Sequence, residues 1–200
     1  MSNNMIVRAF QSQNGLDVDG LIGPLTTARA AHVLGVSSLG RAPIPKNRAG
    51  LHAVYGDPGP WKKVGKGRIV DLSDQWEAEN VRWFRLHTGK RVRFHRLCGD
   101  EFVQLFETAC GESGYTPKSV QTYNPRVIGG TKRLSMHAYA IAFDVDPRQN
   151  PWGGKQRNGD PSLLRQHPEF VAVFESAGWT WGGRWRKGKG DDMHFQRAGT

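Results

Sequence analysis

The residues best suited to chemistry lie in the segment Ser135-Met-His-Ala-Tyr-Ala-Ile-Ala-Phe-Asp-Val-Asp146. If residues 140–146 form a strand, their side chains alternate between two faces. One face is apolar and suits a core, whereas the other presents small alanines beside Asp144 and Asp146, which leaves room for a ligand. His137 comes just before this strand and is near enough along the chain to turn toward Asp144.

A second histidine lies near the C-terminus, in Asp191-Asp-Met-His-Phe195. A short strand there would direct Met193 and Phe195 toward the core and His194 to the opposite face. Two histidines and one aspartate make a three-ligand zinc site with the fourth position open, which is typical of catalytic rather than structural zinc. The open position would hold the water that attacks a substrate. From spacing alone, the alternative that these side chains are only structural stays open.

A carboxylate beside such a site would take and return a proton during hydrolysis. Asp191, three residues before His194, is the candidate for this role, and Asp192 is the alternative. Strict alternation along the strand favours Asp192, but Asp191 precedes the strand, where alternation need not apply.

Several separate motifs together resemble a known family. The run Ser135-x-His137-x-x-Ala140-x-Ala142-x-Asp144 is followed by Gly178-Trp-Thr-Trp-Gly-Gly183 and then by Asp191-x-x-His194. Over residues 115–197, and in this order, they are similar to the D-alanyl-D-alanine carboxypeptidase and L-alanyl-D-glutamate endopeptidase family. That family includes vancomycin-resistance dipeptidases and many phage endolysins, and it shares its fold with the hedgehog signalling domain.

The resemblance implies roles for individual residues. It maps His137, Asp144 and His194 onto the zinc ligands and Asp191 onto the catalytic acid/base. Arg126 lies where the family often has an arginine that steadies the scissile carbonyl or its oxyanion through charge-assisted hydrogen bonds. A solvated loop arginine is the alternative for this position.

Other positions near these motifs are less determined. Ala140 stands where the family usually has glycine, and we expect the change to be tolerated unless the position needs a positive φ. Ser135 is a candidate for substrate binding, with a turn role as the alternative. Trp179 is expected in the core, whereas Trp181 and Trp185 either wall the cleft or fill the core beneath it. Of these two, Trp181 is the candidate for substrate binding.

The function that the resemblance implies is that of a peptidoglycan peptidase with Zn²⁺ as its cofactor. Cleavage between L-alanine and D-glutamate is the preferred specificity, because the GWTWGG and DDMH segments look most like the endolysin branch. A D-alanyl-D-alanine carboxypeptidase is the alternative within the class, and a catalytically silent wall-binding module is the alternative outside it. The expected partner is bacterial peptidoglycan, and we expect a monomer that binds no nucleic acid and inserts into no membrane.

The elements that must position these residues indicate an α+β domain over residues 68–200, with a small antiparallel sheet and flanking helices as in the hedgehog-type fold. Periodicity predicts helices near 74–87, 100–110 and 162–177, and strands at 140–146 and 192–197. The preceding stretch, 39–67, is rich in proline and glycine and is predicted to be a linker that merges into irregular structure.

Residues 1–38 are predicted to form a short helical module. One helix ends near Gln13, a turn-rich loop follows, and Pro24 begins a second helix. The run Phe10-Gln11-x-x-Asn14-Gly15-Leu16-x-Val18-Asp19-Gly20-x-Ile22-Gly23-Pro24-x-Thr26 resembles the last two helices of the peptidoglycan-binding module found beside many wall hydrolases. The alternative is a truncated remnant packed on the catalytic domain.

The chain is strongly basic, with 28 Lys and Arg against 18 Asp and Glu, a net charge of +10. This charge predicts attraction to nucleic acid, anionic lipid or an acidic cell wall, or else serves only solubility. One basic cluster would suit nucleic acid but lacks a recognition motif: Arg82, Arg85, Lys90, Arg91, Arg93 and Arg96.

No apolar run approaches the roughly 20 residues of a membrane span, and the N-terminus lacks a signal-peptide core. With the endolysin resemblance, this predicts a protein that is made in the host cytoplasm and reaches the wall after holin-type release. Cys98 and Cys110 flank a predicted helix that separates them beyond disulfide reach, so both are expected to be free thiols.

Overall fold

The computed structural model describes residues 3–14, 18, 20, 43–156, 158–185 and 190–199. The chain forms two compact units, Met1–Arg41 and Ala42–Thr200. In the first unit the structure describes helix α1 (Asn3–Gln13), and the predicted helix ending near residue 13 is confirmed. The predicted second helix and most of the loop before it fall outside the described residues, so the resemblance to a peptidoglycan-binding module stays a prediction.

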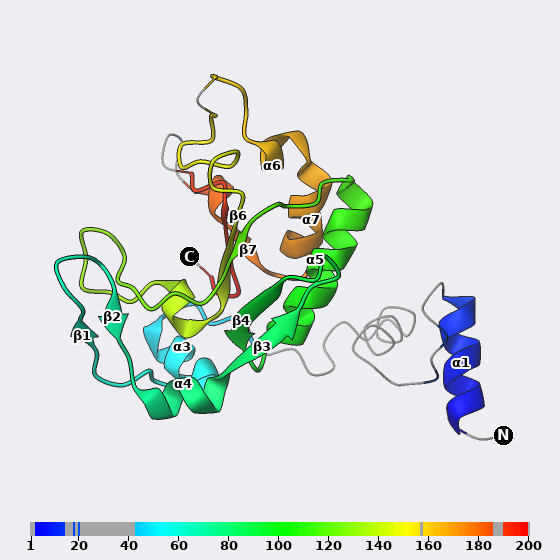
Figure 1. The fold of residues 1–200 in the computed structure, drawn as a ribbon, viewed down its shortest axis with the longest axis horizontal. Helices are drawn as coiled ribbons and strands as arrows, with labels where there is room; N and C mark the ends of the chain where they lie inside the picture. The colour runs from blue at the N-terminus through cyan, green and yellow to red at the C-terminus, as the bar shows by residue number, and fades with distance from the viewer. Residues whose placement is uncertain are drawn as a thin grey trace. The chain divides into compact units, whose positions relative to one another are not determined.

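A four-stranded antiparallel sheet lies at the centre of the second unit (Figure 1). Its strands, in spatial order, are β5 (Val120–Gln121), β6 (Ala142–Val145), β8 (His194–Gln196) and β7 (Thr180–Trp181). Across the two middle strands Phe143 pairs with Phe195, and Asp144 pairs with His194. Both strands predicted around these residues are confirmed, and each is shorter than expected.

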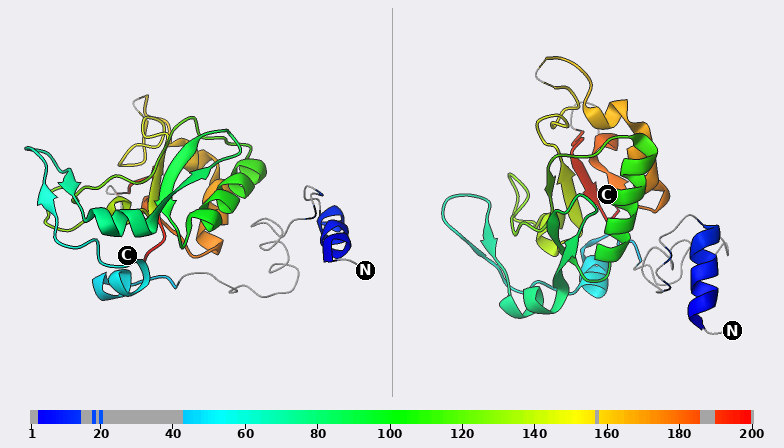
Figure 2. Two further views of the ribbon diagram at one scale, coloured as in Figure 1. Left: turned by 60° about the horizontal axis from the view of Figure 1, so that its bottom comes forward. Right: turned by 45° about the vertical axis from the view of Figure 1, so that its right-hand side comes forward.

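Helices cover one face of this sheet (Figures 1 and 2). Helix α5 (Gly99–Ser113) packs against α7 (Pro168–Ser176) and against the hairpin of β3 (Val81–Arg85) and β4 (Arg91–His95). Asp100 and Glu101 in the first turn of α5 suit the positive end of the helix dipole, and Gly114 ends the helix in a left-handed conformation. The sequence therefore specifies both ends of α5, and the mixed α+β fold is as predicted.

Aromatic rings fill the layer between the sheet and these helices. Phe143 and Phe195 stack across β6 and β8 with centroids 4.8 Å apart. Phe102 of α5 and Phe174 of α7 contact Phe143, and all four rings are fully buried. Each contributes about 1.5–3 kcal/mol by burial, which holds the two strands in one register. Because side chains alternate along a strand, Asp144 and His194 lie on the face away from this core.

Two predicted helices are interrupted. The helix expected over 74–87 is α4 (Asp74–Asn80), which gives way to β3 at Val81. The β-branched and aromatic residues of this segment favour a strand once they pair with β4. The helix expected over 162–177 divides into α6 (Leu163–Gln166) and α7, because Pro168 disfavours helical geometry at the preceding residue.

The prediction that residues 39–67 are irregular was wrong for α3 (Arg48–Tyr55) and for strand β1 (Lys62–Lys63), which pairs with β2 (Val70–Asp71). Asn47 caps α3 by accepting the Gly50 N–H. The Tyr55 hydroxyl is buried and donates to the Arg197 carbonyl, 3.3 Å away. The prolines and glycines around this short helix predicted irregular structure for the whole segment. Tertiary contacts stabilise the helix.

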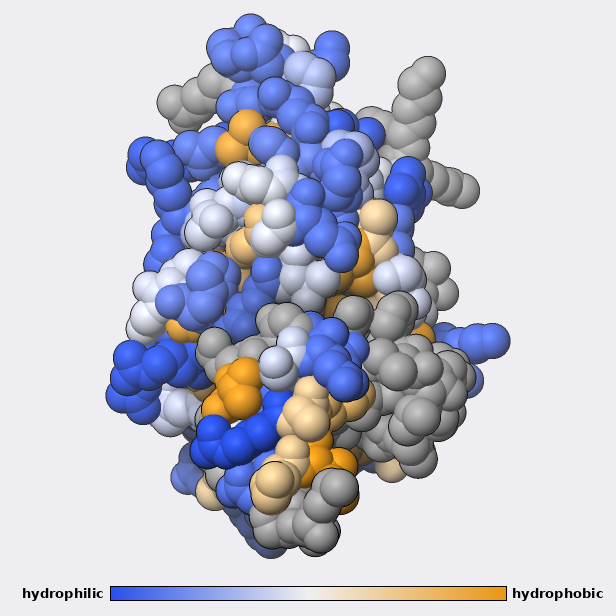
Figure 3. Space-filling view, turned by 90° about the vertical axis from the view of Figure 1, so that its right-hand side faces the viewer, coloured by the Kyte–Doolittle hydropathy of each residue, from blue (hydrophilic) through white to orange (hydrophobic). Residues whose placement is uncertain are grey.

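The surface is largely hydrophilic on the face drawn in Figure 3, where apolar residues form small separate patches. Within the ranges that the structure describes, none of the helices is long and apolar enough to cross a membrane. Both cysteines are buried free thiols, as expected from the helix between them.

Candidate metal centre

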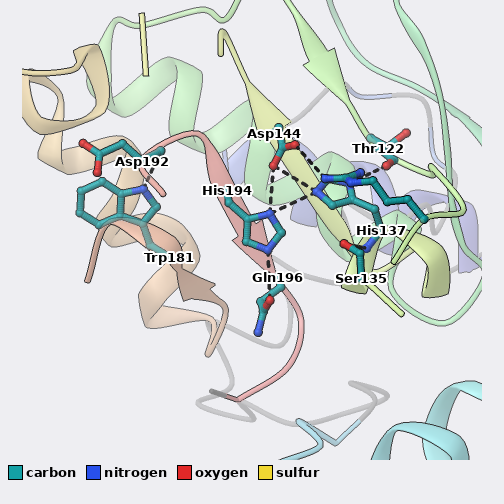
Figure 4. A network of polar contacts seen from close by, with 9 residues as sticks. Thr122, Ser135, His137, Asp144, Trp181, Asp192, His194 and Gln196 are labelled. Atoms are coloured by element: carbon teal, nitrogen blue, oxygen red, sulfur yellow. Dashed lines mark hydrogen bonds and ion pairs between the residues drawn. The ribbon is translucent and has the colours of Figure 1, made fainter. Parts of the chain in front are cut away.

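Three ionisable side chains meet on the sheet face opposite the aromatic core (Figure 4). His137 Nε2 lies 3.1 Å from Asp144 Oδ1 and 3.1 Å from His194 Nδ1. His194 Nδ1 lies 2.9 Å from the same Asp144 oxygen. All three residues are buried, and one atom from each lies within 4.8 Å of the other two. A single metal ion can therefore contact all three.

A one-turn 3₁₀ helix, η1 (Met136–Tyr139), positions His137. The Ser135 hydroxyl caps the turn by accepting the His137 N–H at 3.4 Å, which matches the turn role considered for this serine. Ala140 ends the turn with φ of +54°, and its N–H donates to the His137 carbonyl. Position 140 therefore does need a positive φ, and alanine adopts this conformation at a conformational cost of about 1–2 kcal/mol.

The tautomer of His137 is fixed from outside the cluster. Its Nδ1 lies 2.7 Å from the carbonyl oxygen of Thr122, which can only accept, so Nδ1 carries the proton. A neutral imidazole has one N–H, so Nε2 of His137 carries no proton and directs its lone pair at Asp144.

A glutamine fixes the tautomer of His194 in the same way. His194 Nε2 lies 3.1 Å from the side chain of Gln196. The amide nitrogen of Gln196 donates to the carbonyls of Ala198 and Gly199, each at 3.3 Å, so its oxygen is the atom that faces the histidine. His194 Nε2 is therefore the donor, and Nδ1 presents a lone pair to Asp144.

When both rings are neutral, two nitrogen lone pairs and a carboxylate oxygen therefore converge with no proton between them. Such a cluster is stabilised by a cation, and two imidazoles with one carboxylate are ligands that zinc prefers. Imidazole N–H groups that donate to a carbonyl and an amide oxygen are the outer partners usual for zinc-bound histidines. The residues present therefore fit a zinc ion.

The electrostatics of the cluster favour a positive charge beside Asp144. Burial pushes the pKa of Asp144 up, but its contacts with the two histidines outweigh burial and hold the pKa below its ordinary value. Burial lowers the pKa of His137, which keeps that ring neutral. Burial also disfavours the charged form of His194, but the neighbouring Asp144 carboxylate outweighs this and raises its pKa. His194 is therefore the candidate ligand at which a proton would compete with a metal.

The two adjacent aspartates near the C-terminus have different surroundings. Asp191 Oδ1 is buried without a hydrogen-bond partner among the described residues, and burial raises the pKa of this carboxyl. Asp192 is fully buried, accepts from the Ser162 hydroxyl and pairs with Arg165 at 2.6 Å. Asp192 is therefore engaged in structure, whereas Asp191 is available to exchange a proton.

Glycines of the GWTWGG segment allow Asp191 to approach. The Asp191 N–H donates to the Gly182 carbonyl at 3.0 Å. A Cβ at Gly182 would lie 2.5 Å from the carbonyl oxygen of Asp191, so only glycine fits there. This close approach holds Asp191 beside the histidine that follows it by three residues.

Trp181 supports the same segment from within. It is 4% exposed, and its indole N–H donates to the Asp192 carbonyl at 2.8 Å. The guanidinium groups of Arg165 and Arg184 lie 5.5 and 5.4 Å from its ring centroid. This burial leaves the ring little surface for the substrate contact considered from the sequence, and Trp181 instead fixes the aspartate pair.

Arg126 lies at the edge of the cluster. Its guanidinium is 3.6 Å from Asp144 Oδ2, and four-fifths of its side chain is buried. Its carbonyl accepts the Ser135 N–H at 2.9 Å, which ties it to the turn that holds His137. The structure therefore brings Arg126 to the candidate ligands, in contrast to the alternative of a solvated loop arginine.

Sequence reasoning missed several neighbours of the cluster. Thr122 acts through its carbonyl, so its residue type gives no signal. Gln196 lies two residues after His194 on one strand, and alternation alone places the two on the same face. Exposed Trp152 pairs with Asp191 through a backbone bridge. Trp185, considered from the sequence as a cleft wall, has its ring centroid 5.5 Å from that of His194.

Asp146 does not join the cluster, although alternation places it on the same face as Asp144. Its φ of +40° turns the chain at the end of β6. Its carboxylate accepts from the Tyr115 hydroxyl and from the N–H groups of Lys118 and Ser119. Asp146 therefore holds the loop before β5.

Residues 129–197 match a family model described as D-alanyl-D-alanine carboxypeptidase. No curated protein and no solved structure matches the chain. The matched range includes His137, Asp144, Asp191 and His194, whereas Arg126 precedes it. Over these residues, which are about a third of the chain, the region of the cluster is similar to this peptidase family.

Proposed function

We propose that the chain is a zinc-dependent peptidase that hydrolyses the stem peptides of peptidoglycan. The observation that carries this proposal is the convergence of two imidazole nitrogens on Asp144, close to Asp191, whose Oδ1 is buried without a hydrogen-bond partner among the described residues. The family match over residues 129–197 supports the substrate class.

In this proposal His137, Asp144 and His194 hold the metal. Zinc, when bound, supplies a Lewis acid that polarises the scissile carbonyl and makes water more acidic. Asp191 accepts a proton from the attacking water at Oδ1 and returns it to the leaving amine, and its raised pKa, caused by burial, suits the return. Arg126 supplies positive charge where the carbonyl oxygen becomes negative.

We infer cleavage between L-alanine and D-glutamate, because the GWTWGG and DDMH segments resemble the endolysin branch. A D-alanyl-D-alanine carboxypeptidase is the second candidate, favoured by the description of the matching family model. Mass spectrometry of digested muropeptides separates the two. A new D-glutamate amino terminus supports the first activity, and loss of a terminal D-alanine supports the second.

The biological setting that we propose is that of a monomeric phage endolysin. It would be made in the host cytoplasm and reach the wall after holin-type release, with residues 1–38 aiding attachment to the wall. Expression in a bacterial host tests this setting. Lysis only when a holin is co-expressed would support it, and lysis without a holin would point to another route of export.

The decisive experiment measures metal content together with hydrolysis. We expect about one zinc per chain and turbidity loss of isolated peptidoglycan that a chelator abolishes and zinc restores. In His137→Ala, zinc content and activity should fall together. Full zinc occupancy in that variant would show that the ligand set is wrong. Protein that holds no metal and does not respond to a chelator would favour the silent wall-binding module.

A further inference from the structure

Aromatic rings and guanidinium groups alternate along the hairpin of β3 and β4 and the neighbouring Tyr123. Trp83 is 58% exposed, and the guanidinium carbons of Arg91 and Arg93 lie 4.7 and 5.9 Å from its ring centroid. Arg93 also lies 4.7 Å from the ring centroid of Tyr123. We call the series Arg91, Trp83, Arg93 and Tyr123 the hairpin ladder.

Strand pairing adds Arg85 to the same face. Trp83 pairs with Arg93 and Arg85 pairs with Arg91, whereas Phe94 of β4 is fully buried on the other face. Like charges directly opposite each other in a sheet are destabilising. Arg85 and Arg91 are both exposed, and neither forms an ion pair with a carboxylate in the described part of the chain. This charge is therefore available for an anionic partner.

The ladder is held in place and leads to the metal centre. Glu77 accepts from both Arg93 and the Tyr123 hydroxyl, which fixes these two members relative to each other. The Tyr123 N–H donates to the Arg93 carbonyl at 3.3 Å. Tyr123 follows Thr122, whose carbonyl accepts from His137. A polymer lying on the ladder would thus extend toward the candidate ligands.

An accessible ring flanked by guanidinium groups suits a polymer that combines flat apolar faces with negative charge. Sugar rings present C–H groups that pack on an indole face, and guanidinium groups pair with carboxylates in a bidentate manner. Peptidoglycan offers both, in its glycan and in its stem-peptide carboxylates. Single-stranded nucleic acid also stacks on such rings. The function proposed for the adjacent centre is stem-peptide hydrolysis, which favours peptidoglycan as the partner.

We propose that the hairpin ladder binds the peptidoglycan strand away from the bond that is cut, with Trp83 against a sugar ring and Arg85 and Arg91 against carboxylates. The choice of partner rests on the proposed function, since the ladder adjoins the centre assigned to stem-peptide hydrolysis.

The test is sedimentation of the full-length, metal-stripped protein with isolated sacculi freed of phosphate polymers by hydrofluoric acid. Trp83→Ala is expected to raise the dissociation constant about tenfold, as expected for an aromatic anchor. The double variant Arg85→Gln/Arg91→Gln should weaken binding as well. The matched control Lys62→Gln/Lys63→Gln removes the same charge from the exposed strand β1 and should bind more tightly than the Arg85/Arg91 variant.

Hydrolysis by the zinc-loaded proteins separates this proposal from the proposed function. Ladder variants should cleave a short soluble stem peptide at the wild-type rate and cleave intact sacculi more slowly. If the ladder variants sediment with sacculi as the wild type does, the ladder proposal is overturned and the proposed peptidase function is unaffected. A wild-type protein that cleaves neither substrate would refute the peptidase, and sedimentation would still decide the ladder.

Two further results would also overturn the ladder proposal. One is loss of wild-type binding after acid treatment of the sacculi, which would assign the ladder to a phosphate polymer. The other is that the wild type binds a mixed-sequence oligonucleotide more tightly than it binds sacculi, and that the ladder variants lose this binding. That result would assign the ladder to nucleic acid.

Discussion

The side-chain oxygen of Gln196 accepts the Nε2 proton of His194 across 3.1 Å. This bond leaves Nδ1 of the histidine as the atom that faces Asp144. The residue that selects which nitrogen of His194 faces Asp144 is therefore a neutral amide two positions further along the same strand.

Replacing Gln196 should change metal affinity more than fold. Gln196→Leu removes the acceptor, and we expect zinc affinity to fall about 10- to 100-fold. Gln196→Glu keeps an acceptor oxygen and should bind zinc at least as tightly as the wild type. Competition with a chromophoric chelator at constant pH measures both affinities. Equal affinities in the two variants would show that this hydrogen bond does not control the ligand.

The adjacent aspartates should separate catalysis from stability. Asp191→Asn is expected to keep zinc and to lower turnover about 10²- to 10⁴-fold, because the proton acceptor is lost. Asp192→Asn weakens the contact with Arg165 and should lower the free energy of unfolding by about 2 kcal/mol, with turnover per folded molecule near wild type. Zinc content, steady-state rates and urea denaturation test the pair. Unchanged turnover in Asp191→Asn would remove Asp191 from the mechanism.

Arg126 should affect rate rather than metal content. Arg126→Lys keeps the charge but loses the planar fork of donors, and we expect turnover to fall about 10- to 100-fold with zinc content unchanged. Arg133→Lys, at an exposed position of the following loop, is the control and should retain wild-type turnover. If both variants turn over at the same rate, Arg126 does not act on the reacting carbonyl.

His95 should make the fold sensitive to acid. It is fully buried, its Nε2 donates to the Tyr55 carbonyl, and its Nδ1 accepts the Leu97 N–H. Burial lowers its pKa to about 4, whereas an unfolded histidine titrates near 6.5. As the pH falls below about 6.5 the unfolded chain binds the proton first. The free energy of unfolding should therefore decrease, by about 2 kcal/mol between pH 7 and pH 5.

Urea denaturation of the wild type and His95→Gln at these two pH values measures that contribution. The variant should lose about this part of the pH dependence while retaining the parts due to other groups. The same decrease in both proteins would mean that His95 is protonated in the native state.

The local chemistry of the candidate centre could be predicted because alternation along a strand is a geometric property. Phe143 and Asp144 had to face opposite sides, and a similar argument applied to His194 and Phe195. The same rule failed for Asp146, because its positive φ ends the strand. Long-range placement was not predictable from alternation, and motif order rather than spacing suggested that His137 and His194 would meet.

Contacts made by main-chain atoms, or by residues far apart in the sequence, could not be predicted from residue types. Thr122 holds His137 through a carbonyl that any residue possesses. Trp181 was considered for the substrate, but its burial depends on Arg165 and the Asp192 carbonyl, which come from other segments. A short helix such as α3 depends on tertiary contacts more than on propensity, so composition alone suggested a linker.

Helix α3 and the residues before it determine how far the second unit can be shortened from its N-terminal end. The Tyr55 hydroxyl bonds the Arg197 carbonyl, and the Gly199 N–H donates to the Pro45 carbonyl at 2.9 Å. Gly199 in turn helps to orient Gln196. A truncated protein that starts at residue 68 would lose these anchors and free the C-terminal strand end beside His194. The smallest unit that folds on its own and keeps the proposed activity should therefore retain the chain from about Pro43 onward.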